Sequence, residues 1–256
     1  MRSNTIIVGV LACLAAGGAL SQSWLSSATS EPSSPEAEFH MGRLAYATAG
    51  GCAGSRGWCN EWWAIDYPLA EAHFLPAVER MTRIAVAEDS RHVQILDDTI
   101  FDYPWLLMQQ PGRGFWEPSA EEAARLREYL LRGGFLVVDD FHGEYEWLVF
   151  QSAVQRVFPD RPIIDIPEDD ILMDILFDLD KRTQIPGERH LGWQQMEGPA
   201  AWRGIYDDEG RLMVAINFNI DMGDAWEHAD DPHYPAPMTA LAYRFGVNYV
   251  VYAMTH

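Results

Sequence analysis

The sequence predicts a single α/β domain with a largely parallel sheet and one β-hairpin. Two apolar runs, "YPWLLMQ" (103–109) and "FLVVDD" (135–140), flank a segment with helical spacing. Continuous apolar runs of this kind are typical of strands that are covered on both faces. In "WRGIYDDEGRLMVAINFN" (202–219), the turn residues "DDEG" separate two β-rich segments, which predicts the hairpin.

The helix between the two apolar runs carries its own start and stop signals. Ser119 and Glu122 have the spacing of a capping box. Gly133 and Gly134 follow the last apolar residue, where a left-handed residue commonly ends a helix. Strand, helix and strand in this order predict a βαβ unit with a right-handed crossover.

The remaining elements are shorter or less regular. Further strands are expected in "RLAYATA" (43–49), "HVQIL" (92–96) and "PIIDI" (162–166). Helices are expected within 66–84, 146–158 and 238–256. Pro76 lies inside the first of these helices, so we expect a kink or a restart there.

The first residues of the chain have the pattern of a secretory signal. Arg2 precedes an apolar run of about 15 residues, and small residues follow the run. A membrane span needs about 20 apolar residues, so an uncleaved N-terminal anchor is the second choice. We therefore expect a signal or anchor over 1–21, a disordered Ser/Pro/Glu linker over 22–38 and the folded domain over 39–256. The predicted location is the periplasm or cell envelope, with membrane contact only through an uncleaved N-terminus.

Cys52 and Cys59 are the two cysteines that follow the predicted signal. An even pair in an exported protein favours a disulfide. The alternative is a pair of thiolate metal ligands, but no closely spaced His or Cys partners follow.

The formal net charge of −20 limits the possible partners. Nucleic acid and anionic lipid surfaces would be repelled. A divalent cation, or a neutral or cationic ligand, is compatible with this charge, and so is a simple role in solubility.

The first candidate site is "DDFHGE", at the end of the apolar run 135–140. In open α/β sheets, ligands bind beyond the carboxyl ends of the strands. Alternation puts Asp139 and Asp140 on opposite faces, so at most one of them points into a given crevice, and the other caps the following helix or pairs with a cation. Asp140 or Asp139 is predicted to act as general base or nucleophile, with His142 assisting.

The second candidate site is "NFNIDMGDAWE", which follows the apolar run of the hairpin. Alternation predicts that Asn217, Asn219 and Asp221 line one surface, where their oxygens suit calcium or another divalent cation. Asp224 and Glu227 have the spacing of an N-cap and its partner. No other cofactor is predicted.

Two residues outside these clusters are weaker candidates. Arg244, on the closing helix, is predicted to contribute to ligand binding. His190 lies in "GERHLGW", a segment with the composition of an exposed loop.

Familiar catalytic motifs are missing from the sequence. There is no G-x-S-x-G elbow, and no cysteine follows "FLVVDD". The segment "GGCAGSRG" lacks the Lys-Ser/Thr ending of a phosphate-binding loop.

Several segments resemble a bacterial family known as domain of unknown function 4159. They are "RLAY", "FDYPWLLMQ", "LREYLLRGGFLVVDD", "RGIYDDEGRLMVAINFNIDMGDAWE" and "AYRFGVNYVVYAMT". The resemblance implies a class I glutamine-amidotransferase-like domain, that is, a flavodoxin-like three-layer sandwich. Such relatives carry a nucleophilic Cys at the elbow that reads "DDFHG" here, so glutamine hydrolysis through a thiol is not expected. The family provides no catalytic residues to carry over.

Two functions follow from these observations. The first is a non-catalytic, exported envelope protein that binds a small molecule or an envelope protein partner through the carboxyl edge of its sheet. The alternative is a hydrolase acting on a sugar or amide, possibly assisted by a cation. The alternative requires Asp140, His142 and Asn219 to converge on one pocket.

Overall fold

The computed structural model describes residues 37–48, 61–179, 182–192 and 197–256 of the chain. The predicted signal, the linker up to residue 36 and the cysteine pair Cys52–Cys59 lie outside the described residues.

A seven-stranded sheet has the order β2-β1-β3-β4-β7-β6-β5. The strands are β1 (Met41–Ala45), β2 (Arg91–Gln94), β3 (Trp105–Gln109), β4 (Phe135–Phe141), β5 (Ile164–Asp165), β6 (Ala201–Tyr206) and β7 (Leu212–Phe218). The pairs from β2 to β7 are parallel, whereas β6 pairs antiparallel with β7, and β5 pairs antiparallel with β6. The parallel part has the flavodoxin-like strand order. The predicted mostly parallel sheet with a hairpin is therefore confirmed.

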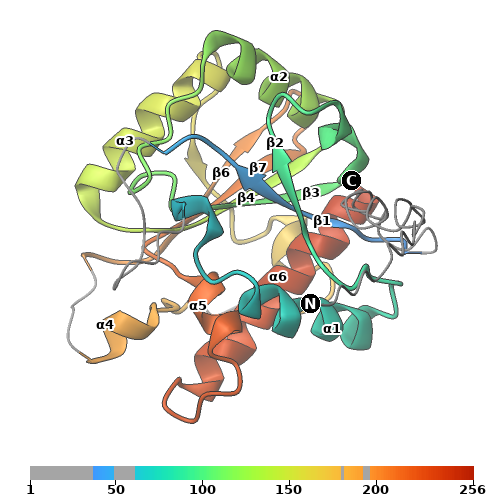
Figure 1. Ribbon diagram of the computed structural model, residues 1–256, viewed down its shortest axis with the longest axis vertical. Helices are drawn as coiled ribbons and strands as arrows, with labels where there is room; N and C mark the ends of the chain where they lie inside the picture. The colour runs from blue at the N-terminus through green and yellow to red at the C-terminus, as the bar shows by residue number, and fades with distance from the viewer. Residues whose placement is uncertain (1–36, 49–60, 180–181, 193–196) are drawn as a thin grey trace, which may run out of the picture. The chain divides into compact units, whose positions relative to one another are not determined.

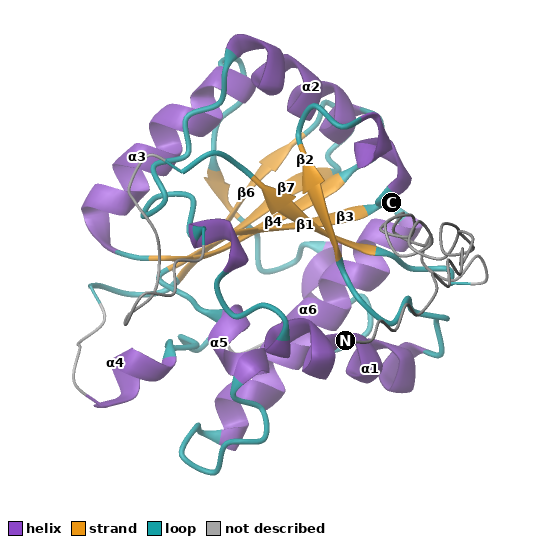
Figure 2. Cartoon of the chain, viewed as in Figure 1, coloured by secondary structure: helices purple, strands orange, loops and turns teal. Residues whose placement is uncertain are grey.

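Helices cover both faces of the sheet and give three layers (Figures 1 and 2). They are α1 (Leu69–Thr82), α2 (Ala120–Leu131), α3 (Gly143–Val157), α4 (Glu188–Gly192), α5 (Met222–Glu227) and α6 (Ala236–Thr255), with short 3-10 turns η1 (Trp62–Ala64), η2 (Asp98–Asp102) and η3 (Ile171–Met173). α2 and α3 lie on one face, and α1, α5 and α6 pack together on the other. In the part of the chain that the structure describes, no helix combines the length and the apolar character that crossing a bilayer requires.

Each face of the sheet has its own apolar core because β3 and β4 are buried along their whole length. On the α1 side, Phe74 stacks on Trp226 with ring centroids 4.1 Å apart. On the α2 side, Leu106, Leu126 and Phe150 are fully buried. These side chains account for the apolar runs on which the strand predictions depend.

Most sequence predictions for single elements agree with the structure. Ser119 and Glu122 form the predicted capping box, and Gly133 has a φ of 110° at the end of α2. The helix predicted from 66 starts three residues later and runs through Pro76 without a restart. The strand predicted over 162–166 is shorter, because only two of its residues pair with the edge strand β6.

The topology places a switch point at the carboxyl edge of the sheet. The helix that follows β1 packs on one face, whereas the helix that follows β3 packs on the other. The segments that leave the two neighbouring strands therefore diverge at their carboxyl ends, and such a switch point is where open α/β sheets bind ligands.

Candidate functional site

The two predicted polar clusters meet at the carboxyl edge of the sheet. The Asn217 amide donates to Asp139 Oδ1 over 3.2 Å, and the Gly143 backbone NH donates to Asn219 Oδ1 over 2.9 Å. These contacts follow from the parallel pairing of β4 and β7, whose last residues lie side by side. The prediction that both clusters share one edge is confirmed.

Asp139 is engaged entirely by structural hydrogen bonds. Its Oδ2 accepts from the backbone NH groups of Met222 (2.8 Å) and Gly223 (3.1 Å), at the start of α5. Its Oδ1 accepts from Asn217. Burial and the neighbouring Asp140 raise the pKa of Asp139 to about 8, against the lowering effect of these donors. Asp139 therefore caps α5 and not α3, the helix that follows it in the chain, for which the sequence predicts the cap.

Asp140 turns toward His142 instead. Its Oδ1 lies 3.0 Å from His142 Nε2, and its Oδ2 accepts from the Gln110 amide. Burial alone would raise the pKa of Asp140, but the hydrogen bond and charge of His142, together with Arg189 and Gln110, lower it below its ordinary value. His142 Nδ1 is buried and has no hydrogen-bond partner among the described residues. Asp140 is thus an ionised carboxylate beside an imidazole that has one nitrogen unused.

Asn217 and Asn219 do not line one surface as alternation predicts. Asn217 is buried under α6, where its Oδ1 accepts from the Tyr249 hydroxyl over 2.7 Å. The chain leaves the extended conformation at Asn219, which has a φ of 55°. Both atoms of the Asn219 amide bond to backbone, to Gly143 N and Pro199 O. The alternation of side chains stops at Asn219. Both amides bond to other parts of the domain and therefore stabilise the fold.

We expect the substitution Tyr249→Phe to lower the free energy of unfolding by about 1–3 kcal/mol, because it leaves the buried Asn217 oxygen without a donor. The matched control is Tyr145→Phe on α3, where the tyrosine is 66% exposed and the change should stay within about 0.5 kcal/mol. Urea denaturation of both variants measures the difference. Equal midpoints for Tyr249→Phe and wild type would contradict the role assigned to Asn217.

Asp221 is the N-cap of α5. Its Oδ1 accepts from Asp224 N over 2.8 Å, so the helix starts three residues earlier than the "DAWE" spacing predicts. Asp224 lies inside the first turn of this helix, and its Oδ2 accepts from Glu188 N over 2.7 Å. Asp221 itself is 0% exposed, and its Oδ2 has no hydrogen-bond partner in the described part of the chain. A buried carboxylate oxygen without a partner destabilises the fold unless a hydrogen-bond donor or a cation contacts it.

Asp66 also belongs to this site and lies in the loop between β1 and α1. The sequence does not predict that Asp66 is a site residue. Its Oδ2 accepts from the Gln109 amide over 3.3 Å. The loop is held by Arg43, whose guanidinium donates to the carbonyls of Trp63 and Ile65. The sequence around Asp66 has the composition of a helix start, so it does not predict that this side chain points inward. In the structure the backbone turns at Asp66, which has a φ of 64°.

His190 also belongs to the site, although its segment has a loop composition. It lies in the short helix α4, with its ring centroid 4.7 Å from that of His142. A Cβ placed on Gly187 would lie 2.5 Å from Asp221 Oδ2, 3.0 Å from Asp224 Oδ2 and 3.1 Å from His190 Nδ1. These three polar atoms therefore lie together against the backbone at Gly187, where a side chain would not fit.

Burial and neighbouring charges shift the pKa values of several titratable groups at this edge. Burial raises the pKa of both Asp66 and Asp221 well above the ordinary value, and neighbouring carboxylates add to the effect. Burial, followed by Asp140, also raises the pKa of Asp224. Burial and the charges of His142 and Arg189 lower the pKa of His190 to about 4, so this imidazole is neutral at pH 7. We call Asp66, Asp140, Asp221 and Asp224 the acidic cluster.

Backbone conformation distinguishes the same edge. Asp66, Gln110, Asp140 and Asn219 all have φ between 48° and 64°, in the left-handed region that side chains other than glycine seldom adopt. Each of them bonds to another residue of this edge. Strained positions of this kind gather at functional sites, where packing holds them in place.

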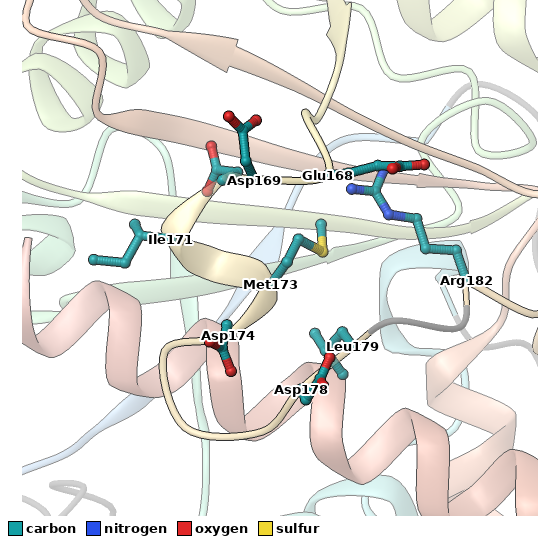
Figure 3. A pocket seen from close by; sticks show the side chains of 9 residues that line it. Glu168, Asp169, Ile171, Met173, Asp174, Asp178, Leu179 and Arg182 are labelled. Atoms are coloured by element: carbon teal, nitrogen blue, oxygen red, sulfur yellow. The ribbon is translucent and has the colours of Figure 1, made fainter.

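Arg244 and an acidic surface pocket around η3 lie apart from the cluster. Arg244 donates to the Ala240 carbonyl of its own helix, and the described residues include no contact between it and the cluster. A pocket of about 780 Å³ surrounds η3 (Figure 3) and is lined by five acidic side chains, Arg182 and apolar residues. Arg182 binds the carbonyls of Ile166 and Pro167, and Asp170 binds Leu172 N and the Tyr206 hydroxyl. These bonds order the surrounding loop.

The acidic cluster has the donor atoms of a metal site. In the described residues, the ligand atoms of Asp140, His142 and Asp221 lie within 4.8 Å of one another, and so do those of Asp66, Asp221 and Asp224. A third group at the end of α5 consists of Asp224, Glu227 and His228. Carboxylates suit hard divalent cations, and an imidazole adds affinity for transition metals. Such a cation can hold a ligand or activate a water molecule.

Comparison with known proteins assigns the family. A family model described as "Domain of unknown function (DUF4159)" matches residues 41–254. This match includes every strand and helix described above apart from the last residue of α6. A search of curated proteins found no match. The chain therefore belongs to the family of domains of unknown function named DUF4159.

Proposed function

We propose that this domain binds a divalent metal cation through Asp140, His142 and Asp221, and that the cation in turn binds a small, oxygen-rich ligand without chemical change. The observation that carries this proposal is the Oδ2 atom of Asp221. It is fully buried and has no hydrogen-bond partner within the described residues. A carboxylate oxygen of Asp221 lies within 4.8 Å of the ligand atoms of Asp140 and His142.

The donor set favours a particular kind of cation. Calcium takes six to eight oxygen ligands, whereas this group offers one nitrogen and two carboxylates. A mixed set of imidazole and carboxylate suits Mn²⁺ or Zn²⁺ better. The hydrogen bond from Gln110 to Asp140 orients that ligand, as outer partners do in metal sites.

A cation-assisted hydrolase of sugars or amides is the second candidate function. The observation that favours it is the Asp140–His142 pair, in which the carboxylate contacts one imidazole nitrogen and leaves the other without a described partner. A carboxylate in this position orients an imidazole as a general base. In that function the cation would lower the pKa of a bound water, and His142 would accept its proton.

The wider relationship and the location belong to the same proposal. A class I glutamine-amidotransferase-like ancestry is supported by the flavodoxin-like strand order. It is also supported by Asp140, which has a φ of 55° and lies just before the strand-to-helix turn, where such relatives carry their nucleophile. Export to the cell envelope is supported by the sequence of residues 1–21 alone.

The test is a titration of the full chain with MnCl₂, followed by calorimetry and thermal unfolding. At about 100 times the Kd, the cation should raise the free energy of unfolding by about 2.7 kcal/mol. For a domain of this size, that corresponds to a rise in melting temperature of roughly 5–10 °C. Asp221→Asn should abolish the rise. Asp174→Asn, in the acidic pocket of Figure 3, is the matched control and should leave it unchanged.

Two outcomes would decide against the proposal. Equal shifts for Asp221→Asn and wild type would show that the ion binds elsewhere on the acidic surface. Turnover of a nitrophenyl glycoside or an anilide by the Mn²⁺-loaded chain, lost in His142→Gln, would replace the binding function by the hydrolase.

A further inference from the structure

The acidic cluster holds a second set of ligand atoms that the proposed function does not use. Asp66, Asp221 and Asp224 place their ligand atoms within 4.8 Å of one another, and Asp221 is common to both groups. These residues come from two places in the fold, the loop before α1 and the first turn of α5. We call this group the Asp66 position, and the group of Asp140, His142 and Asp221 the Asp140 position.

We infer that the Asp66 position binds a second divalent cation, bridged to the first by the carboxylate of Asp221. The inference rests on the proposed function, because Asp221 belongs to both positions. It assigns Asp66 and Asp224 as metal ligands and makes the site a two-cation centre.

Unpaired polar atoms beside the Asp66 position point to a ligand there. Asp221 is 0% exposed, and so is Gln109, whose amide contacts Asp66. Neither Asp221 Oδ2 nor Gln109 Oε1 has a hydrogen-bond partner among the residues described. Native structures satisfy nearly all buried polar side-chain atoms. Two unsatisfied oxygens next to one group of carboxylates therefore indicate a missing positive partner.

The backbone at Gly187 packs closely against donor atoms of this position. The virtual Cβ of Gly187 lies 2.5 Å from Asp221 Oδ2 and 3.0 Å from Asp224 Oδ2. His190 Nδ1, which is buried and unpaired within the described chain, lies 3.1 Å from the same point. A side chain at this position would collide with these donor atoms, so glycine is what allows the chain to pass so close to them.

The charge of the cluster matches two cations better than one. Four carboxylates, Asp66, Asp140, Asp221 and Asp224, belong to the two positions. One divalent cation balances two of them, and two cations balance all four. Arg43 offsets only part of the charge of Asp66, because its Nε lies 2.6 Å from Glu71 Oε1 in a buried ion pair.

The third group, Asp224 with Glu227 and His228, lacks these features. His228 Nε2 lies 3.7 Å from Glu227 Oε2, and the two side chains are 29% and 26% exposed. They compensate each other in partial contact with solvent. The inference is therefore limited to two cations.

Stoichiometry with Mn²⁺ tests the inference. We expect the full chain to bind two equivalents of MnCl₂ in calorimetry. Asp66→Asn should bind one equivalent, and asparagine suits the positive φ at this position. His142→Gln should weaken the other equivalent at least tenfold. Asp174→Asn, in the separate acidic pocket, should still bind two.

Electron paramagnetic resonance gives an independent readout. Two Mn²⁺ ions that share a carboxylate are magnetically coupled, so the hyperfine pattern of isolated Mn²⁺ should be lost in the loaded wild type and return in Asp66→Asn. Circular dichroism confirms that each variant is folded.

The outcomes separate the two proposals. One equivalent in wild type, weakened by His142→Gln and unaffected by Asp66→Asn, would overturn the second cation and leave the proposed function intact. No binding by the wild type would overturn both. Two equivalents without magnetic coupling would overturn the bridge by Asp221.

Discussion

Replacing Glu71 by glutamine is expected to lower the free energy of unfolding by about 3–5 kcal/mol, because it leaves a buried arginine without its counter-ion. Arg43 is 0% and Glu71 is 1% exposed, with Arg43 Nε 2.6 Å from Glu71 Oε1. Ser90 adds a second contact, since its hydroxyl donates to the same oxygen over 3.2 Å. Chemical denaturation of Glu71→Gln against wild type measures the loss.

The matched control is Asp98→Asn, which removes the partner of Arg125 from a surface pair in which the aspartate is 98% exposed. Exposed pairs of this kind contribute about 0–1 kcal/mol. A loss no larger than that of the control would mean that Arg43 is compensated by another group, and the pair would then have no special role.

A double variant links this ion pair to the site. Arg43→Met with Glu71→Leu replaces both charges by apolar groups, and such exchanges are often neutral for stability. The double variant also removes the donors that hold the Trp63 and Ile65 carbonyls, just before Asp66. We therefore expect it to regain most of the stability that Glu71→Gln loses but to bind one Mn²⁺ fewer.

Without metal, the domain is expected to become less stable as the pH rises from about 4 to above 8. The pKa values of Asp66, Asp221 and Asp224 are raised, and that of Asp139 is raised to about 8. An unfolded aspartate has a pKa of about 3.9. A carboxyl whose pKa is raised by folding stabilises the folded state below the unfolded pKa, and this contribution is lost as the pH rises through the folded pKa.

The expected slope is steep. Each proton that the folded state holds in excess lowers the free energy of unfolding by about 1.4 kcal/mol per pH unit. Bound cations replace these protons, so the stabilisation by MnCl₂ should grow with pH over the same range. Thermal unfolding between pH 5 and pH 9, in EDTA and in MnCl₂, measures both effects.

Asp221→Asn is the control for the pH dependence. It removes one carboxylate from the cluster and keeps its shape, so it should raise the stability of the metal-free domain at pH 8 and flatten the slope. Its response to MnCl₂ should be lost at the same time. A metal-free wild type that gains stability from pH 5 to pH 8 would contradict the assignment of raised pKa values to the cluster.

The candidate site was predicted in part from the sequence. Asp140, His142 and Asp221 follow apolar runs, and the rule that parallel strands end at one edge brings such residues together. Strict alternation predicts Asn217 and Asn219 on one surface only if it is extended beyond the end of β7 at Phe218. The left-handed conformation of Asn219 interrupts it. The end of a strand is where the period-two pattern loses its physical basis.

Asp66 and His190 could not be assigned to the site from sequence. Asp66 precedes a helix and has the composition of a helix start, while His190 lies between segments with little apolar pattern. Their roles depend on which way a loop turns, and that is determined by contacts with distant residues such as Arg43. No local signal in either segment reports these contacts.

The sequence by itself determined most strands, the long helices and the capping box of α2, because apolar periodicity and capping act over a few neighbouring residues. Only the tertiary structure decided which carboxylates share a site. The Asp66 contact with Gln109 spans 43 positions and the Asp139 contact with Asn217 spans 78. Contacts of this range depend on strand order and on the packing of loops against both faces of the sheet. The free-energy cost of bringing these like charges together therefore depends on strand order and loop packing and not on any local segment.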